Sequence, residues 1–307
     1  MRLRIRLLLL LFVVAQSGAV SMASSPASLR CLTFNMLHGG VFSGWVGNGQ
    51  ELDHRLEIML EEFQALDVDI LALQEASTGN SRGNVAERIA ERLGFYFAYA
   101  PAGFRLFSFE PLNTVTNWVM NLTEGPAIVS RFPIVSWQAY DLPRCGRFTD
   151  PRVLLCAELN TPWGPVVVCS THTSGLPCQT ESIVRLTNKH RAALPLLLMG
   201  DFNAPEDSPT IAVLTQGAGF VDTFRLMNPK EAGKTVWQRV DVTYSTVFRR
   251  VDYVFLAPRP DLPMRVASSR VVLNTPRQQG GGRVLWPSDH YGVFTEVQIT
   301  PRSKEPG

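Results

Sequence analysis

Polar side chains stand at the ends of the apolar segments of this 307-residue chain. In six places a carboxylate, an amide or an imidazole directly follows or precedes an apolar run. Each group alone has a plain explanation, because Asn and Asp often make turns and a single His is more often structural. Six such ends favour an assembled site, since ionised groups beside buried strands need partners. The side chains are Asn35, Glu75, His172, Asp201, Asn203, Asp252, Asp289 and His290.

These residue types indicate metal-assisted hydrolysis. Oxygen atoms of Glu, Asp and Asn suit Mg²⁺, and Mn²⁺ accepts a similar ligand set. A His paired with an Asp is a general acid or base whose tautomer is fixed by its partner. A divalent ion and such a pair together suit the attack of water on phosphorus. We therefore expect an oxygen-only ligand set around Glu75 and a requirement for Mg²⁺ or Mn²⁺.

The elements that must position these residues alternate between short strand-like runs and amphipathic helical patterns. Gly94 is expected to end one helix as a C-terminal cap, and residues 160–164 carry a hairpin turn signal. Residues 39–50, 102–125 and 274–287 lack a clear period and are expected to be loops. The predicted helices are 52–66, 85–93 and 181–193, and the predicted strands are 29–35, 68–74, 127–130, 134–142, 153–159, 165–171, 195–200, 251–256 and 292–299.

This order of elements predicts a mixed α and β fold in which antiparallel pairing is common. The sequence shows no repeat, linker or low-complexity tract, and its length suffices for one large core. One domain is therefore expected after residue 23.

Seven segments together resemble the endonuclease/exonuclease/phosphatase superfamily, which includes pancreatic-type deoxyribonucleases, apurinic endonucleases, neutral sphingomyelinases and inositol polyphosphate 5-phosphatases. They occur in the family's order and span nearly the whole chain. Asn35-Met-Leu-His-Gly39 is also similar to the opening of bacterial secreted or membrane-associated members, including relatives of a GPI-anchor remodelling factor. The resemblance implies an α+β fold, a four-layer αββα sandwich of two mostly antiparallel sheets flanked by helices. The segments are Leu32-Thr-Phe-Asn35, Leu73-Gln-Glu75, Ser130-Arg-Phe-Pro133, Ser170-Thr-His172, Gly200-Asp-Phe-Asn203, Arg250-Val-Asp-Tyr253 and Ser288-Asp-His290.

The resemblance also implies roles on the metal side and the acid–base side of the site. Glu75 resembles the main metal ligand of the family, assisted by Asn35 and Asp289. His290 resembles the general base or the group that stabilises the transition state, and Asp252 resembles its orienting partner.

Further roles concern water and phosphate. Asp201 and Asn203 would position the attacking water and a phosphate oxygen, and His172 would bind the phosphate oxyanion. Arg152 stands where some members place a phosphate-contacting arginine, although a surface cation explains it equally well. The sequence leaves open whether Asp201 or His290 activates the water.

The first 23 residues have the three-part layout of a secretory signal peptide. Residues 1–6 contain three arginines and precede the apolar run 7–15. This run is shorter than the ~20 residues needed to cross a bilayer. We expect cleavage after 21–23, leaving 24–307 as a secreted or periplasmic catalytic domain. Loss of the three arginines leaves 26 basic against 27 acidic groups, so bulk charge does not favour nucleic-acid binding.

The five cysteines leave at least one thiol without a partner within the chain. Cys145 and Cys178 lie in loop-like segments and are the preferred disulfide pair. Cys156 and Cys169 face each other across the predicted hairpin, and their apolar surroundings predict buried, reduced thiols.

Three functions remain in competition. The favoured one is hydrolysis of a phosphodiester in a lipid headgroup, with the substrate at a bilayer surface and no obligate protein partner. A secreted endonuclease would use the same site, and an inactive binding module is disfavoured because every motif position is filled. The lipid hypothesis rests on export, a near-neutral charge and loop aromatics that either meet a membrane or cover the loops' own core. These are Phe42, Trp45, Phe104, Phe107, Phe109, Trp118 and Trp286.

Overall fold

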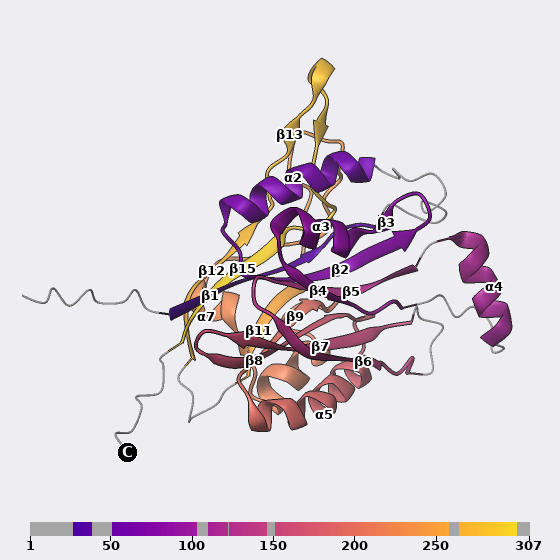
Figure 1. Ribbon diagram of the computed structural model, residues 1–307. Helices are drawn as coiled ribbons and strands as arrows, with labels where there is room; N and C mark the ends of the chain where they lie inside the picture. Colours follow the sequence, from indigo (N-terminus) through magenta and orange to yellow (C-terminus); the bar gives the residue numbers. More distant parts are fainter. Residues whose placement is uncertain are drawn as a thin grey trace, which may run out of the picture.

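Two β-sheets pack face to face with helices on their outer faces in the computed structural model (Figure 1). The structure describes residues 27–38, 51–102, 110–121, 123–145, 151–257 and 264–299. The predicted signal peptide and the loop 39–50 lie outside these residues. The four-layer αββα sandwich predicted from the family resemblance is confirmed.

The first sheet has seven strands, and β1 and β2 at its centre are its parallel pair. The strand β3 (Gly83–Asn84) pairs with β2 beside the main path. The order along that path is β12 (Met264–Val272), β15 (Gly292–Ile299), β1 (Ala27–Asn35), β2 (Ile70–Gly79), β5 (Thr123–Ser130) and β4 (Tyr96–Tyr99).

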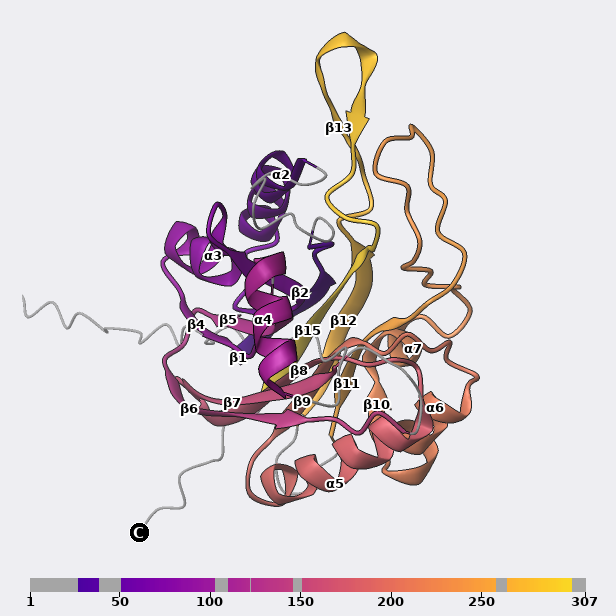
Figure 2. The ribbon, with the colours of Figure 1, turned by 90° about the vertical axis from the view of Figure 1, so that its right-hand side faces the viewer.

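The second sheet has six strands, and its parallel pair is β8 with β9. A separate two-stranded ribbon of β13 (Arg277–Gln278) and β14 (Val284–Leu285) projects from the molecule (Figure 2). The order of the sheet is β10 (Val221–Asp222), β11 (Asp252–Leu256), β9 (Leu196–Asp201), β8 (Gly164–His172), β7 (Val153–Thr161) and β6 (Ile134–Asp141).

The helices cover the outer faces of the sheets. The first sheet is covered by α2 (Leu52–Ala65) and α3 (Val85–Leu93), and the second by α5 (Pro177–Ala193) with the short α6 (Pro209–Ala212). A π-helical turn (Val213–Gly217) follows α6, and α7 (Thr223–Met227) leads away from β10. The Asn84 side chain caps the start of α3, and Gly94, at φ 70°, caps its end as predicted.

Central strands bury both faces, which explains their nearly continuous apolar sequences. In β9, Leu197 and Met199 point into the core between the sheets, whereas Leu196 and Leu198 point toward α5. The same alternation in β1 sends Cys31 between the sheets, and its neighbours Leu32 and Phe34 contribute to the core under α2 and α3.

Some elements were not predicted. The predicted loop 102–125 is wrong in part, because it contains α4 (Glu110–Met120) and the start of β5. Its helical period is hard to recognise because Leu112, Val115 and Val119 face solvent. The β13–β14 ribbon lies within the predicted loop 274–287. Among the described residues, no helix is long and apolar enough to span a bilayer.

Two disulfides join parts of the second sheet and its helix layer. The predicted Cys145–Cys178 disulfide is confirmed, and it ties the chain after β6 to α5. Cys156 and Cys169 are opposed in the β7–β8 register as predicted, but they form a disulfide. The prediction of reduced thiols is therefore wrong, because burial does not separate side chains that the register places face to face. Cys31 is the free, buried cysteine among the described residues.

Gly200 is expected to be essential for the packing of β9 against β8. A Cβ atom at this position would lie 2.1 Å from the Thr171 carbonyl oxygen, so Gly200→Ala must push the two central strands apart. We expect it to lower the free energy of unfolding by about 1–3 kcal/mol or more, as overpacking does. Denaturant unfolding monitored by circular dichroism measures this loss.

The matched control is Gly217→Ala, whose added Cβ would meet only the Ala212 carbonyl oxygen, at 3.9 Å. This variant should unfold within about 0.5 kcal/mol of wild type, as most substitutions away from tight contacts do. Equal stability of the two variants would refute the packing argument.

Candidate active site

The strand ends that carry the predicted site residues meet at one edge of the sandwich, the edge toward which β2 points in Figure 1. The two parallel pairs end there, and the sheet register brings the next residues alongside. Asp201 at the end of β9 is paired with His172 of β8 on one side and Asp252 of β11 on the other. His290 precedes β15 at the same edge.

Glu75 and Asn35 join the two sheets at this edge. Glu75 has φ 54° at the irregularity between Leu73 and Ala76, a left-handed conformation that re-aims its side chain. The buried Asn35 donates from Nδ2 to Glu75 Oε1 at 3.0 Å and to Asp201 Oδ2 at 3.1 Å. Its Oδ1 accepts from the Leu37 amide at 3.1 Å, so the amide here orients two carboxylates. Its role as a metal ligand stays a prediction.

Asp201, Asn203 and His172 form a second connected group. The Asn203 amide N–H donates to Asp201 Oδ1 at 2.8 Å, a bond made possible by φ 49° at Asn203. Asn203 Nδ2 lies 2.9 Å from His172 Nε2 and donates to the Thr173 carbonyl at 2.9 Å. His172 Nε2 is 3.4 Å from Asp201 Oδ2. The Asn203 backbone thus holds the Asp201 carboxylate, and the Asn203 side chain holds the His172 ring beside it.

His290 and Asp252 form the predicted pair. Asp252 is fully buried, and its Oδ2 lies 2.9 Å from His290 Nδ1. The opposite ring nitrogen, Nε2, lies 3.7 Å from Asp201 Oδ2. The ring is therefore fixed between two carboxylates.

Asp289 is placed by its neighbour Ser288 and by the first sheet. Ser288 Oγ donates to the Asn35 carbonyl at 2.7 Å and lies 3.3 Å from Asp289 Oδ1. The buried Arg55 of α2 donates to the carbonyls of Met36 and Pro287, at 2.6 and 3.1 Å. The loops after β1 and before β15 are thereby held together.

Burial and mutual repulsion shift the pKa values of the buried acids. Desolvation, followed by the charge of Asp252, raises the pKa of Asp201 to about 7. Desolvation also raises the pKa of Asp289. Desolvation lowers the pKa of His290, but the carboxylates of Asp252 and Asp201 outweigh it and raise the pKa to about 10. His172 differs, because desolvation and the charge of Arg152 hold its pKa well below the usual value.

The donor set of this edge fits a divalent cation. Several carboxylates converge in a buried region, where a cation would offset both their desolvation and their repulsion. In the part of the chain that the structure describes, Asp252 Oδ1 is buried and accepts no hydrogen bond. A buried carboxylate oxygen in that state needs a cation or a water molecule. The oxygen donors that the sequence predicts are present at this edge, and their role as metal ligands stays a prediction.

Arg152 reaches the same cleft. A small cleft next to the site is lined by Glu75, Glu124, Arg152 and His172, among others. Arg152 Nε donates to Ser174 Oγ at 3.2 Å. The position fits the predicted phosphate contact, which stays a prediction.

Two residues in this region, His38 and Glu124, were not among the site residues predicted from the sequence. His38 Nε2 lies 3.3 Å from Glu124 Oε2 and 3.9 Å from Glu75 Oε2. The surroundings of Glu75 therefore include an imidazole, which the expected oxygen-only ligand set did not contain. His38 stands in the motif Asn35-Met-Leu-His-Gly39 and was a readable signal, whereas Glu124 lies in a stretch without a recognisable pattern.

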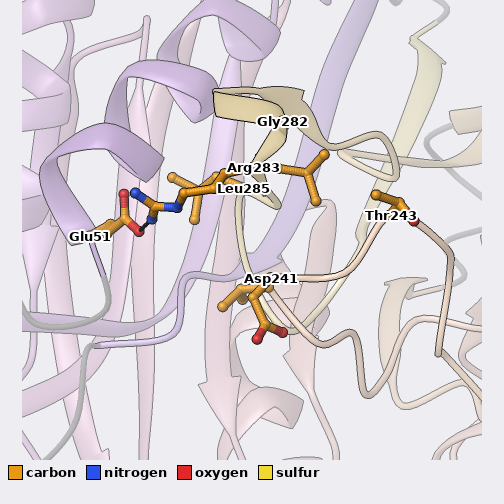
Figure 3. Close-up of a pocket in the computed structure, with 8 residues that line it drawn as sticks. Glu51, Asp241, Thr243, Gly282, Arg283 and Leu285 are labelled. Atoms are coloured by element: carbon orange, nitrogen blue, oxygen red, sulfur yellow. Dashed lines mark hydrogen bonds and ion pairs between the residues drawn. The ribbon is translucent and has the colours of Figure 1, made fainter. Parts of the chain in front are cut away.

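A separate pocket lies beside the β13–β14 ribbon (Figure 3). Arg283 reaches across to an ion pair with Glu51 in front of α2, and Asp241 and Thr243 line the opposite wall. None of the eight described residues that line it belongs to the predicted site.

In the metal-free protein, the raised pKa of Asp201 should make stability depend on pH. The folded state keeps a proton on Asp201 up to about pH 7, whereas an unfolded chain releases it near pH 4. The folded state then binds more protons within this window, so Asp201 lowers stability as the pH rises through it. In chelator, the Tm of Asp201→Asn relative to wild type should increase from about pH 4.5 to about pH 6.5.

Differential scanning calorimetry measures this trend, with the exposed Asp207→Asn as the matched control. That variant should follow the pH dependence of wild type. Parallel curves for all three proteins would show that Asp201 does not titrate as its surroundings indicate.

Comparison with solved structures identifies the same fold in several proteins of low sequence identity. An endonuclease/exonuclease/phosphatase family protein from Bacteroides thetaiotaomicron has a TM-score of 0.68 at 16% identity, covering 90% of this chain and 99% of that one. The human Nocturnin catalytic domain with bound sulfate has a TM-score of 0.63 at 19% identity, covering 90% and 94%. A mannosyl-6-phosphatase from the same Bacteroides species has a TM-score of 0.63 at 16% identity, covering 89% and 99%.

Sequence comparison gives the family. Against curated protein sequences the chain has no significant match. The family model described as "Endonuclease/Exonuclease/phosphatase family" matches residues 32–290, a span that includes every predicted site residue. Members of this family are hydrolases that act on phosphoesters. The chain belongs to the endonuclease/exonuclease/phosphatase family.

Proposed function

We propose that this protein is a Mg²⁺- or Mn²⁺-dependent phosphodiester hydrolase that acts on a lipid headgroup. The observation that carries the chemistry is the single hydrogen-bonded cluster formed by Asn35, Glu75 and Asp201, with His290 and Asp252 beside it. A general acid–base pair next to converging carboxylates is suited to hydrolysis at phosphorus.

Asp201 and His290 divide the acid–base work in this proposal. The raised pKa of Asp201 makes its carboxylate a proton acceptor near neutral pH, and Oδ2 faces the imidazole ring. The raised pKa of His290 favours the imidazolium, whose Nε2–H can stabilise negative charge on a phosphoryl oxygen. Asp252 fixes the ring through Nδ1 and supports its positive charge. Asp201 is therefore the stronger candidate for activating water.

The divalent ion would be held by Glu75, with Asp289 and Asn35 beside it. When bound there, it would act as a Lewis acid that polarises a phosphoryl oxygen. Asn203, His172 and Arg152 line the neighbouring part of the cleft and would bind the remaining phosphate oxygens. With its pKa held low, His172 is neutral at pH 7 and binds through an N–H dipole rather than a charge.

Exposed apolar side chains near the catalytic edge support a lipid substrate. Leu112, Val115 and Val119 of α4 are 47–55% exposed, at spacings that place them on one face of the helix. α4 lies beside the edge toward which β2 points (Figure 1). Such a helix suits insertion into a bilayer interface. Trp237, Tyr244 and Phe248, in the segment 237–248, are also exposed, and the rings of Trp237 and Phe248 pack edge to face.

Of the loop aromatics named from the sequence, Trp286 does not belong to this surface. It is buried, stacks on Tyr291 and donates to the Val242 carbonyl. Of the two alternatives left open for these aromatics, Trp286 fits the second, because it fills the core of its own loop. The others lie outside the described residues or side chains.

Export remains part of the proposal and is supported by two disulfides, which persist in oxidising compartments. The nuclease alternative shares the catalytic chemistry, and a substrate panel separates the two.

His290→Ala should reduce kcat by at least ~10²-fold, the low end of the loss when a donor that stabilises transition-state charge is removed. KM should change much less, because the lost interaction stabilises the transition state. Asp252→Asn should impair the same step, and the double variant should be little worse than His290→Ala, because the two residues act as one unit. Steady-state kinetics on a soluble phosphodiester measure these effects.

The matched control for this series is His54→Ala, which removes an exposed histidine of α2. Glu75→Gln should differ from the histidine variants, since added metal should partly restore its activity. Near-normal turnover by a folded His290→Ala enzyme would make this histidine structural and end the proposed mechanism.

A substrate panel tests the lipid proposal. In Mg²⁺ or Mn²⁺, sphingomyelin and phosphoinositide vesicles should be hydrolysed faster than plasmid DNA or bis(p-nitrophenyl) phosphate, and excess chelator should abolish activity. Val115→Glu should slow hydrolysis in vesicles but not that of the soluble diester, because a charge on α4 opposes insertion. Leu226→Glu, an equally exposed site on α7, is the control.

Preferential cleavage of DNA would establish the nuclease alternative. Full activity in chelator would show that the mechanism needs no metal. If Val115→Glu hydrolyses lipid in vesicles as fast as wild type, α4 does not contact the lipid surface.

A further inference from the structure

His38, Glu75 and Glu124 form a three-residue cluster at the mouth of the catalytic cleft. One ligand atom from each lies within 4.8 Å of the others. The side chains are only partly buried, with 17–18% of their surface exposed, so the cluster is open to solvent. The cluster contains Glu75, the proposed main metal ligand, and two residues to which no role has been assigned.

The backbone around the cluster is held in place. Arg82 donates to the His38 carbonyl at 2.5 Å and to Ser77 Oγ at 2.9 Å, which ties the segment after β1 to β2. Glu124 is fixed on the other side, because its carbonyl accepts from the Ala102 amide at 2.7 Å. Gly125 allows this close approach, since a Cβ there would lie 2.0 Å from the Ala100 carbonyl oxygen.

The distances from His38 to the two carboxylates suit ligands of one ion. Ligands at ~2.1 Å from an octahedral cation lie at most about 4.2 Å apart. His38 Nε2 is 3.3 Å from Glu124 Oε2 and 3.9 Å from Glu75 Oε2, both within that limit. Two carboxylates and an imidazole also form a donor set that differs from an oxygen-only site. A nitrogen ligand strengthens the binding of divalent transition metals much more than that of Mg²⁺.

We propose that His38 and Glu124 are ligands of the metal held by Glu75, which makes this a mixed nitrogen–oxygen site selective for Mn²⁺ over Mg²⁺. The inference rests on the proposed metal-dependent function and adds to it the ligands and the metal preference. The competing explanation is that a protonated His38 bridges Glu75 and Glu124 without touching an ion.

Electron spin-echo envelope modulation of bound Mn²⁺ tests this directly, without any assay of activity. At one equivalent of Mn²⁺, wild type should show ¹⁴N modulation from a coordinated imidazole, and His38→Gln should lose it. Calorimetric titration should give a Mn²⁺ Kd raised about tenfold or more in His38→Gln, the scale seen when support for a metal ligand is removed. The Mg²⁺ Kd should rise less, so the preference for Mn²⁺ should shrink.

Glu124→Gln provides a second variant. It should weaken the binding of both Mn²⁺ and Mg²⁺ and keep the ¹⁴N modulation, because His38 remains in place. His54→Gln, an exposed histidine, should match wild type in every measurement. Circular dichroism checks that each variant is folded.

The outcomes separate the two proposals. Wild type that binds Mn²⁺ without ¹⁴N modulation, or a folded His38→Gln with unchanged Mn²⁺ affinity, overturns the ligand assignment and leaves the proposed function standing. Wild type that binds neither ion overturns both.

Discussion

The structure depends on keeping one carboxylate, that of Asp201, buried among other charged groups. An isolated ionised carboxylate in such a place is costly, and the neighbouring Asp252 adds to the cost. The fold offsets this with an amide from Asn35, a backbone N–H from Asn203 and the ring of His290. These partners come from β1, from the turn after β9 and from the segment before β15. The carboxylate is stable only if both sheets end at the same edge.

The two parallel strand pairs provide that edge. Antiparallel neighbours end at opposite edges, so β1 with β2 and β8 with β9 are needed to bring two chain ends from each sheet together. A polar contact then connects the sheets behind the site, where Gln74 Nε2 donates to Ser170 Oγ at 3.3 Å and Ser170 Oγ donates to the Leu73 carbonyl at 3.1 Å. Such contacts fix the spacing between the layers more specifically than apolar packing alone.

The residues that follow buried strands were predictable, and the residues fixed by tertiary contacts were not. Asp201 and His172 stand at strand ends whose apolar runs are read directly from the sequence. The six such ends favoured an assembled site, and the family resemblance added the roles of its residues. Glu124 joins the site only because β5 pairs with β2 and Ala102 bridges to it, a long-range pairing with no local signal. The Cys156–Cys169 pair shows a different limit of the sequence, since here the contact was predictable and the chemical state was not. The hairpin turn predicted the contact between these cysteines, but their burial was a poor guide to their oxidation state.

The segment 237–248, which carries exposed aromatic residues, is hydrogen-bonded to the chain at the catalytic edge. Gln238 donates its backbone N–H to the Asp289 carbonyl at 2.7 Å, and Trp286 donates from its own backbone to the Val240 carbonyl at 3.0 Å. Residues 237–248 also carry Trp237 and Phe248, whose rings pack edge to face with Arg249 over both. Under the proposed function, a substrate that binds these rings would contact the same backbone segment that holds Asp289. This loop would then couple substrate binding to the position of the Asp289 carboxylate, whereas the other proposed catalytic groups are positioned by strand ends.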